Sequence, residues 1–254
     1  MKKLLAMTAL SAALFFGQTA VAEEKAAEEV KPSHVEMVLV LDESGSMSDL
    51  TRDTIGGFNS MIEKEKKLDV DAHVTTVLFN DQYKMLYNRR ELKDVSKMTD
   101  KDYTPGGMTA LLDAVGRTIH KMDMVAGIHR KDKGNKVLFV IITDGEENDS
   151  KEYTYADVKK LIKDRQENAG WEFIFLGANI DAAAAAENLG IDRDRAVKYK
   201  NTGSGVRANF KAVAELSDSL AKSGRVSDRW KETVEKDEDD AADKQSAAVT
   251  SHRR

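Results

Sequence analysis

Three short, continuously apolar runs place the strongest limit on how this chain can fold. They span Met37–Leu41, Val137–Ile142 and Phe173–Leu176. Strands without alternating polar residues are typical of parallel sheets, which helices cover on both faces. The chain has 254 residues, of which 41% are hydrophobic and 33% charged. This composition supplies one large core and excludes a uniformly disordered protein.

Amphipathic helical patterns lie between and after the apolar runs. Their apolar faces consist of Ile55, Phe58 and Ile62, then Leu112, Val115, Ile119 and Met122, then Val158, Leu161 and Ile162, and finally Phe210, Val213 and Leu220. Two further runs, Val74–Phe79 and Lys84–Tyr87, are joined by a link that allows a hairpin but no crossover. We therefore predict an α/β fold: a doubly wound, Rossmann-like, mostly parallel six-stranded sheet with one antiparallel edge strand and helices on both faces.

The first residues have the pattern of an export signal. Lys2 and Lys3 precede the apolar run Leu4–Gly17, which is too short to span a bilayer, and Ala20-Val21-Ala22 has the small residues of a cleavage site. We predict a signal peptide over residues 1–22, export to the periplasm or the medium, and no membrane span in the mature protein. Removing the two lysines changes the formal net charge from −5 to −7.

Both ends of the mature chain differ in composition from its middle. Residues 23–33 read as a charged linker, residues 34–222 as the folded domain, and residues 223–254 as an acidic, partly disordered tail. Glu232–Asp243 holds seven acids against the single Lys236, and a docking tail is the alternative to a solvated end.

The residue counts exclude several kinds of chemistry. The absence of cysteine removes disulfides, thiolate nucleophiles and cysteine-based metal sites. The five histidines show no ligand spacing such as two residues four apart on a helix, so we do not expect a zinc site. The acidic balance, with a pI near 5.7, argues against a general nucleic-acid binder.

Hydroxyl and carboxylate side chains follow the predicted strands or open a predicted helix. Asp42, Ser44 and Ser46 follow the first strand at a spacing of two, which turns them to one side and Glu43 away. Thr109 ends the loop before the central helix, and Asp144 follows the strand Val137–Ile142. These hard oxygen donors suit Mg²⁺ or Mn²⁺. With two acids among five donors, the ion would keep positive character and attract an outside carboxylate.

Each of these residues also has an ordinary structural interpretation. Asp42 and Ser44 fit a turn and a helix N-cap, Thr109 fits a cap, and Asp144-Gly145 fits a common turn. The set indicates a metal site only because its three parts, the Asp42–Ser46 turn, Thr109 and Asp144, occur in this order at predicted strand ends and a helix start.

In this combination the domain resembles a von Willebrand factor type A (VWA) domain. The family's metal-ion-dependent adhesion site (MIDAS) has the pattern Asp-x-Ser-x-Ser, a later Thr and a still later Asp, which matches Asp42, Ser44, Ser46, Thr109 and Asp144. The resemblance implies that the strands ending at Asp42 and Asp144 are neighbours. It also implies divalent-metal-dependent protein binding, often with a partner Asp or Glu as the last ligand. We do not expect the protein to be an enzyme. We expect a monomer.

Two other functions stay open at this point. The ion can be purely stabilising, or the chain can be a Mg²⁺-dependent phosphoryl-transfer or hydrolytic enzyme with Asp42 as nucleophile. An enzyme of that kind needs a Lys or Arg beside the metal, and the nearest, Arg52 and Lys151, are read as solvated.

We predict structural roles for one loop, three methionines and one glycine-rich turn. Residues 146–149 can hold a second cation such as Ca²⁺, but a solvated loop is preferred. Met108, Met122 and Met124 are read as core fillers, and Gly203–Gly205 as the start of a helix.

Overall fold

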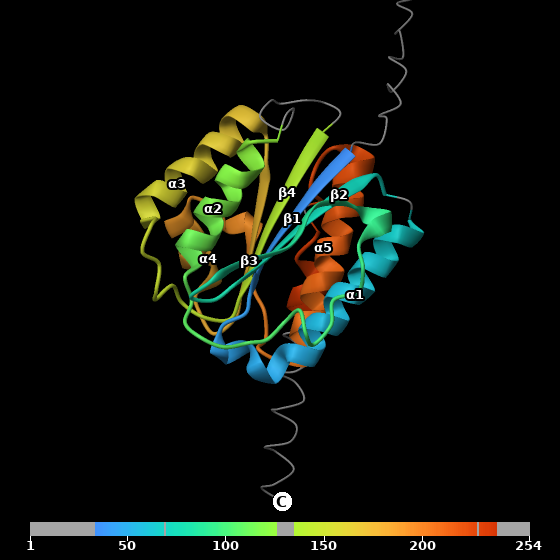
Figure 1. Ribbon diagram of the computed structural model, residues 1–254. Coiled ribbons are helices and arrows are strands. Elements are labelled where there is room, and N and C mark those ends of the chain that lie inside the picture. The colour runs from blue at the N-terminus through green and yellow to red at the C-terminus, as the bar shows by residue number, and fades with distance from the viewer. Residues whose placement is uncertain (1–33, 69, 126–134, 228, 238–254) are drawn as a thin grey trace, which may run out of the picture.

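The computed structural model describes residues 34–68, 70–125, 135–227 and 229–237. The expected signal peptide and the linker of residues 23–33 lie outside these ranges. Figure 1 shows a central twisted sheet between two layers of helices. Within the described residues, no helix is both long and apolar enough to cross a membrane.

In the part of the chain that the structure describes, the sheet has six strands in the order β3-β2-β1-β4-β5-β6. Every neighbouring pair is parallel except β2 and β3, which form the predicted antiparallel hairpin at one edge. The predicted fold class is therefore confirmed. The strands are β1 (His34–Asp42), β2 (Ala72–Phe79), β3 (Tyr83–Glu91), β4 (Asn135–Thr143), β5 (Glu172–Gly177) and β6 (Ala196–Lys198).

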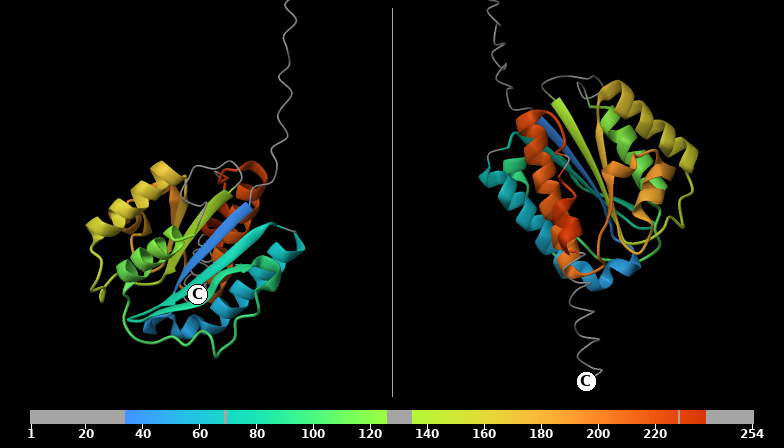
Figure 2. Two further views of the ribbon diagram at one scale, coloured as in Figure 1. Left: turned by 45° about the horizontal axis from the view of Figure 1, so that its top comes forward. Right: turned by 180° about the vertical axis from the view of Figure 1, so that it is seen from behind.

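Among the described residues, five of the helices cover the two faces of the sheet. Helices α1 (Thr51–Lys67) and α5 (Gly203–Ser223) pack on one face, and α2 (Leu111–Asp123), α3 (Tyr155–Asp164) and α4 (Ala182–Leu189) on the other (Figures 1 and 2). Alternate residues of β1 supply both cores: Met37 and Leu39 join the α1–α5 cluster, whereas Val38 and Val40 join the cluster under α2. This double burial explains the continuous apolar runs, because neither face of the central strands meets water.

The packed structure continues beyond α5. Val226, Trp230 and Val234 are buried in the same cluster as α1 and α5, and Trp230 Nε1 donates a hydrogen bond to the Asp194 carbonyl at 3.3 Å. The packed core therefore extends past the boundary expected at residue 222. Residues 238–254 of the predicted tail lie outside the described ranges.

The two central strands, β1 and β4, end at the same edge of the sheet. β1 pairs with β4 in a register that places Leu41 opposite Ile142. Asp42 therefore leaves the sheet beside Thr143 and Asp144, as the resemblance implies. A 3₁₀ helix (Gly45–Leu50) follows β1 directly and leads into α1.

Candidate metal site

Four of the five predicted ligands form a continuous hydrogen-bonded group. The Ser44 amide donates to Asp42 Oδ1 at 2.7 Å, and the hydroxyls of Ser44 and Ser46 are 3.1 Å apart. Ser46 Oγ donates to Asp144 Oδ1 at 2.5 Å. Asp42, Ser44 and Asp144 are buried, whereas Ser46 is exposed. The group is therefore closed toward the core and open toward solvent on the side of Ser46.

The fifth residue, Thr109, lies next to this group. Its Oγ1 would be 3.9 Å from a Cβ placed on Gly145, the residue after Asp144. The N-cap of α2 is Ala110, without a side-chain cap, so the interpretation of Thr109 as a helix cap is wrong. The Thr109 amide instead donates to Asn148 Oδ1 at 2.8 Å.

Backbone hydrogen bonds hold the loop of residues 104–109 against the loop after β1. The Gly106 amide donates to the Glu43 carbonyl at 2.9 Å, and the Gly45 amide to the Gly107 carbonyl at 3.2 Å. Gly107 has a φ of 75°, and a Cβ there would overlap Asp81 Oδ1. Only glycine fits this close approach, so Gly107 allows the loop that carries Thr109 to reach the site.

The electrostatics of the group fit a cation. Asp42 and Asp144 are 1% and 2% exposed, and neither forms an ion pair with a Lys, Arg or His of the described residues. Burial raises the pKa of Asp42, and hydrogen bonds from Ser44 and Thr143 partly offset this rise. Two buried carboxylates without a counter-charge are costly. A divalent ion among these oxygens would remove that cost, and the donor set suits Mg²⁺ or Mn²⁺.

Three residues that the sequence reasoning did not select form hydrogen bonds to Asp42 or Asp144. Thr143 Oγ1 donates to Asp42 Oδ2 at 2.6 Å, and Tyr103 Oη donates to the Asp42 carbonyl at 2.6 Å. Asn201 Nδ2 is 3.4 Å from Asp144 Oδ2. Thr143 is the last residue of β4 and directly precedes Asp144, so its position in the sequence was a usable signal. Tyr103 and Asn201 come from distant loops and gave none.

The segment of residues 146–149 is not simply a solvated loop. Glu147 Oε2 accepts the Leu112 amide of α2 at 3.0 Å, and Glu147 Oε1 accepts the amides of Asp149 and Ser150. Glu147 thus caps the first turn of α2, and its oxygens are already engaged by the chain. Only Glu146 and Asn148 are exposed.

Two other expectations change in detail. Glu43 is turned away from Asp42 as expected, but it is buried, and its Oε1 accepts the Thr104 amide at 2.5 Å. Its side chain therefore supports the loop that carries Thr109. The interpretation of the methionines as core residues holds for Met122, which is buried. It is wrong for Met108 and Met124, which are 51% and 76% exposed.

Sequence spacing did not reveal one group of possible metal ligands that includes two histidines. His34, Glu36 and His73 place one ligand atom each within 4.8 Å of one another, at the opposite end of β1 from Asp42. Strand pairing, and not sequence spacing, brings the two histidines together.

The sheet order and the oxygen-rich group at the ends of β1 and β4 define a VWA fold. Residues 34–190 match the vWA-TerF-like family, described as the vWA found in the TerF C terminus, and the chain belongs to this family. None of the curated proteins compared with the chain matches it.

Solved structures show the same fold at low sequence identity. The pilus adhesin SpaC from Lactobacillus rhamnosus GG has 14% identity and a TM-score of 0.58, with 76% of this chain and 31% of that chain covered. The vWF domain of the pili tip protein Mfa5 from Porphyromonas gingivalis has 12% identity and a TM-score of 0.53, with 78% of this chain and 99% of that chain covered. Proximal thread matrix protein 1 of the mussel byssus, solved with a zinc-occupied MIDAS motif, has 13% identity and a TM-score of 0.51, with 73% of this chain and 46% of that chain covered. The chain thus spans less than half of SpaC and of the byssus protein.

Proposed function

We propose that this protein binds a protein partner through a divalent cation, with an Asp or Glu of the partner as the last ligand. Asp42, Ser44, Ser46, Thr109 and Asp144 would hold Mg²⁺ or Mn²⁺. The observation that carries the proposal is the pair of buried carboxylates, Asp42 and Asp144, which have hydroxyl neighbours but no cationic partner among the described residues.

The hydrogen bonds around Asp42 favour an outside anion. Asp42 Oδ1 accepts the Ser44 amide and Asp42 Oδ2 accepts the Thr143 hydroxyl. These donors already balance part of the carboxylate charge, so less of it is available to neutralise an ion. A bound divalent ion would therefore supply an electrophilic position that a partner carboxylate can fill.

The surface beside the site suits contact with a protein. Met108, next to Thr109, exposes half of its surface. A cavity of about 270 Å³ lies between the Gly145–Glu147 turn and α4, with Ile180 and Leu189 among its lining residues. Met108 would offer a partner an apolar contact, and the cavity, which is lined by apolar and acidic residues, a mixed one.

The relatives support binding and not catalysis. SpaC is named a pilus adhesin and Mfa5 a pili tip protein, and the byssus protein carries zinc in its MIDAS motif. The three loops at this site, Asp42–Met47, Thr104–Thr109 and Thr143–Glu147, contain no Lys or Arg to neutralise a phosphate. These points favour a binding module over an enzyme with Asp42 as nucleophile. We propose in addition that the module is exported and acts as a monomer, and that its ion does more than stabilise the loops.

Metal-dependent capture tests the proposal. The exported chain is immobilised and exposed to envelope proteins of its source in Mg²⁺ or in chelator. Asp42→Ala and Thr109→Ala should abolish capture, whereas Asp100→Ala, which removes an exposed acid from the loop before Tyr103, should leave it intact. The captured partner should then lose binding when one of its own acids is replaced by the amide. A partner retained in chelator and by Asp42→Ala contradicts the metal-bridge proposal.

Export is tested separately. We infer cleavage after Ala22, so the intact mass of the exported protein should correspond to a chain beginning at Glu23. A mass that includes residues 1–22 contradicts this inference without affecting the metal site.

A further inference from the structure

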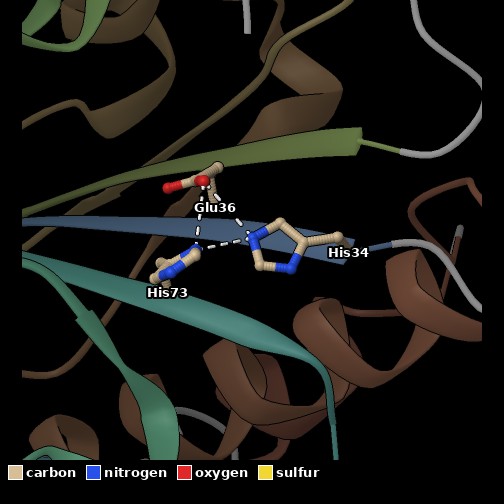
Figure 3. Close-up of side chains that lie close together, drawn as sticks. All are labelled: His34, Glu36 and His73. Atoms are coloured by element: carbon tan, nitrogen blue, oxygen red, sulfur yellow. Dashed lines mark hydrogen bonds and ion pairs between the residues drawn. The ribbon is translucent and has the colours of Figure 1, made fainter. Parts of the chain in front are cut away.

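A second group of metal-ligating atoms lies at the amino end of β1. His34 Nε2 is 2.8 Å from His73 Nδ1, and both nitrogens are 3.3 Å from Glu36 Oε1. Figure 3 shows the two rings and the carboxylate pointing toward one another from β1 and β2. The three atoms form a small triangle with one edge shorter than the other two.

The sheet register fixes this arrangement. His34 and Glu36 are two residues apart on β1, so their side chains leave the same face of the sheet. His73 on β2 is paired with Glu36 across the parallel ladder. The three side chains are therefore held by the most constrained part of the backbone, as a preorganised ligand set requires.

The spacing of the triangle matches one face of a zinc coordination tetrahedron. Zn²⁺ binds imidazole nitrogen and carboxylate oxygen at about 2.0–2.1 Å, which places neighbouring ligand atoms about 3.3 Å apart. The two distances to Glu36 Oε1 have this value, and the distance between the two ring nitrogens must open by about half an ångström. Two imidazoles and one carboxylate also favour Zn²⁺ over Mg²⁺.

The carboxylate of Asp71 contacts His34 from outside the triangle. His34 Nδ1, the nitrogen that faces away from the triangle, is 3.0 Å from Asp71 Oδ1. Metal-binding histidines commonly use their second nitrogen in this way, which fixes the ring and raises its basicity. Glu36 is buried, while the side chains of His34 and His73 are 18% and 27% exposed. The triangle is thus anchored in the protein and reachable from solvent.

The Arg89 guanidinium would compete with a metal ion for Glu36 and His73. Its Nη2 is 2.5 Å from Glu36 Oε1 and 3.3 Å from His73 Nδ1, so the guanidinium lies against the same atoms. Arg89 is on the edge strand β3 and is about one-third exposed. Its Nε also donates to Glu36 Oε2 at 3.0 Å, so an ion bound here would have to replace both of its contacts with the carboxylate.

We propose that His34, Glu36 and His73 form a Zn²⁺ site, with Asp71 orienting His34 and Arg89 occupying the position when the ion is absent. The site is independent of the proposed adhesion site. His34 and Asp42 are at opposite ends of β1, roughly 26 Å apart at the rise of an extended strand.

The test uses Zn²⁺ and Co²⁺ as probes, with the full exported chain carrying Asp144→Ala to weaken the first site. Titration should show one Zn²⁺ equivalent whose affinity falls roughly 10- to 100-fold in Asp71→Asn and further in His73→Ala. Arg89→Ala should raise the affinity, because it removes the competing cation. His120→Ala, an exposed histidine on α2, is the matched control and should change nothing.

The readouts distinguish a built site from adventitious binding. Co²⁺ should give the intense visible absorption of a tetrahedral nitrogen–oxygen site, and this absorption should disappear in His73→Ala. Circular dichroism of each variant checks that it is folded, and His73→Gln repeats the test should the alanine variant unfold. Equal Zn²⁺ affinity in the wild type, His73→Ala and His73→Gln, or weaker binding in Arg89→Ala, would overturn the proposal.

Discussion

Ser46 Oγ donates a 2.5 Å hydrogen bond to Asp144 Oδ1, across 98 positions of sequence. This contact joins the turn after β1 to the turn after β4 and brings an exposed hydroxyl to a buried carboxylate. Because the Asp144 carboxylate is buried without a cationic partner among the described residues, an ion placed here should stabilise the folded chain and gain little from the unfolded one.

The first prediction concerns stability in Mg²⁺. At a hundredfold excess over its dissociation constant, the ion should stabilise the protein by about 2.7 kcal/mol. For a domain of this size the midpoint of thermal unfolding should rise by several degrees. Asp144→Ala should remove most of this rise, and Asp100→Ala should keep it. Thermal unfolding followed by circular dichroism, in Mg²⁺ and in chelator, measures the effect. An unchanged Mg²⁺ response in Asp144→Ala would place the ion elsewhere.

A second prediction compares two buried threonines. Thr143 Oγ1 donates to the Asp42 carboxylate, whereas Thr76 Oγ1 on β2 has no hydrogen-bond partner among the described residues. Thr143→Val should lower the free energy of unfolding by about 1.5–3 kcal/mol, because a hydrogen bond to a charged group is lost. Thr76→Val should be neutral or stabilising. Urea unfolding measures both variants, and equal losses would contradict the assigned role of Thr143.

The sequence predicted the fold because the central strands are buried on both faces. The runs around Leu39, Val140 and Ile174 lack the alternation of half-exposed strands, and the short link Asn80–Gln82 permits only a hairpin. β6 has three residues, too few for a recognisable pattern. The prediction from apolar spacing also ended the domain too early, because Trp230 packs on the core beyond the end of α5.

The candidate sites were predictable to different degrees. Asp42, Ser44 and Ser46 are close in sequence, so their common side followed from the spacing alone. The support from Tyr103 and Asn201 depends on loop paths that no local pattern encodes. His34 and His73 meet only because β1 and β2 pair in one register, and a shift by one residue would separate them.

A third prediction concerns the pH dependence of stability. Glu65 of α1 is fully buried against α5, where Ser217 Oγ donates to its Oε2 at 2.8 Å. Burial and the nearby charge of Asp218 raise the pKa of Glu65 to about 7, against the opposing effects of Ser217, Lys64 and Lys222. The folded state therefore binds the proton more tightly than the unfolded state does.

The sign of the effect follows from this difference. The contribution of Glu65 is fully present below the unfolded pKa of 4.5 and is lost as the pH rises through about 7. The loss should be about 3 kcal/mol in total. Glu65→Gln should flatten this part of the profile, and urea unfolding at about pH 5 and about pH 8 measures it. An unchanged slope in Glu65→Gln would assign the pH dependence to other groups.

A fourth prediction concerns the segment after α5. Trp230 is 2% exposed and packs with Val226 and Val234 on the core. Trp230→Ala should destabilise the protein by about 3–5 kcal/mol, as loss of a buried aromatic ring does. Tyr155→Ala, at a 43% exposed position, should cost far less. Denaturant unfolding compares the two variants. Equal costs would mean that the domain ends near residue 222.

The most direct test of the central claim is the position of a bound ion. A crystal of the wild-type protein grown in Mn²⁺ should give an anomalous difference peak beyond the ends of β1 and β4. We expect the peak within roughly 2.1–2.2 Å of the hydroxyl oxygens of Ser44 and Ser46, with Asp42, Thr109 and Asp144 around it. An ordered site with no Mn²⁺ peak, or a peak bound only by other residues, would contradict the account.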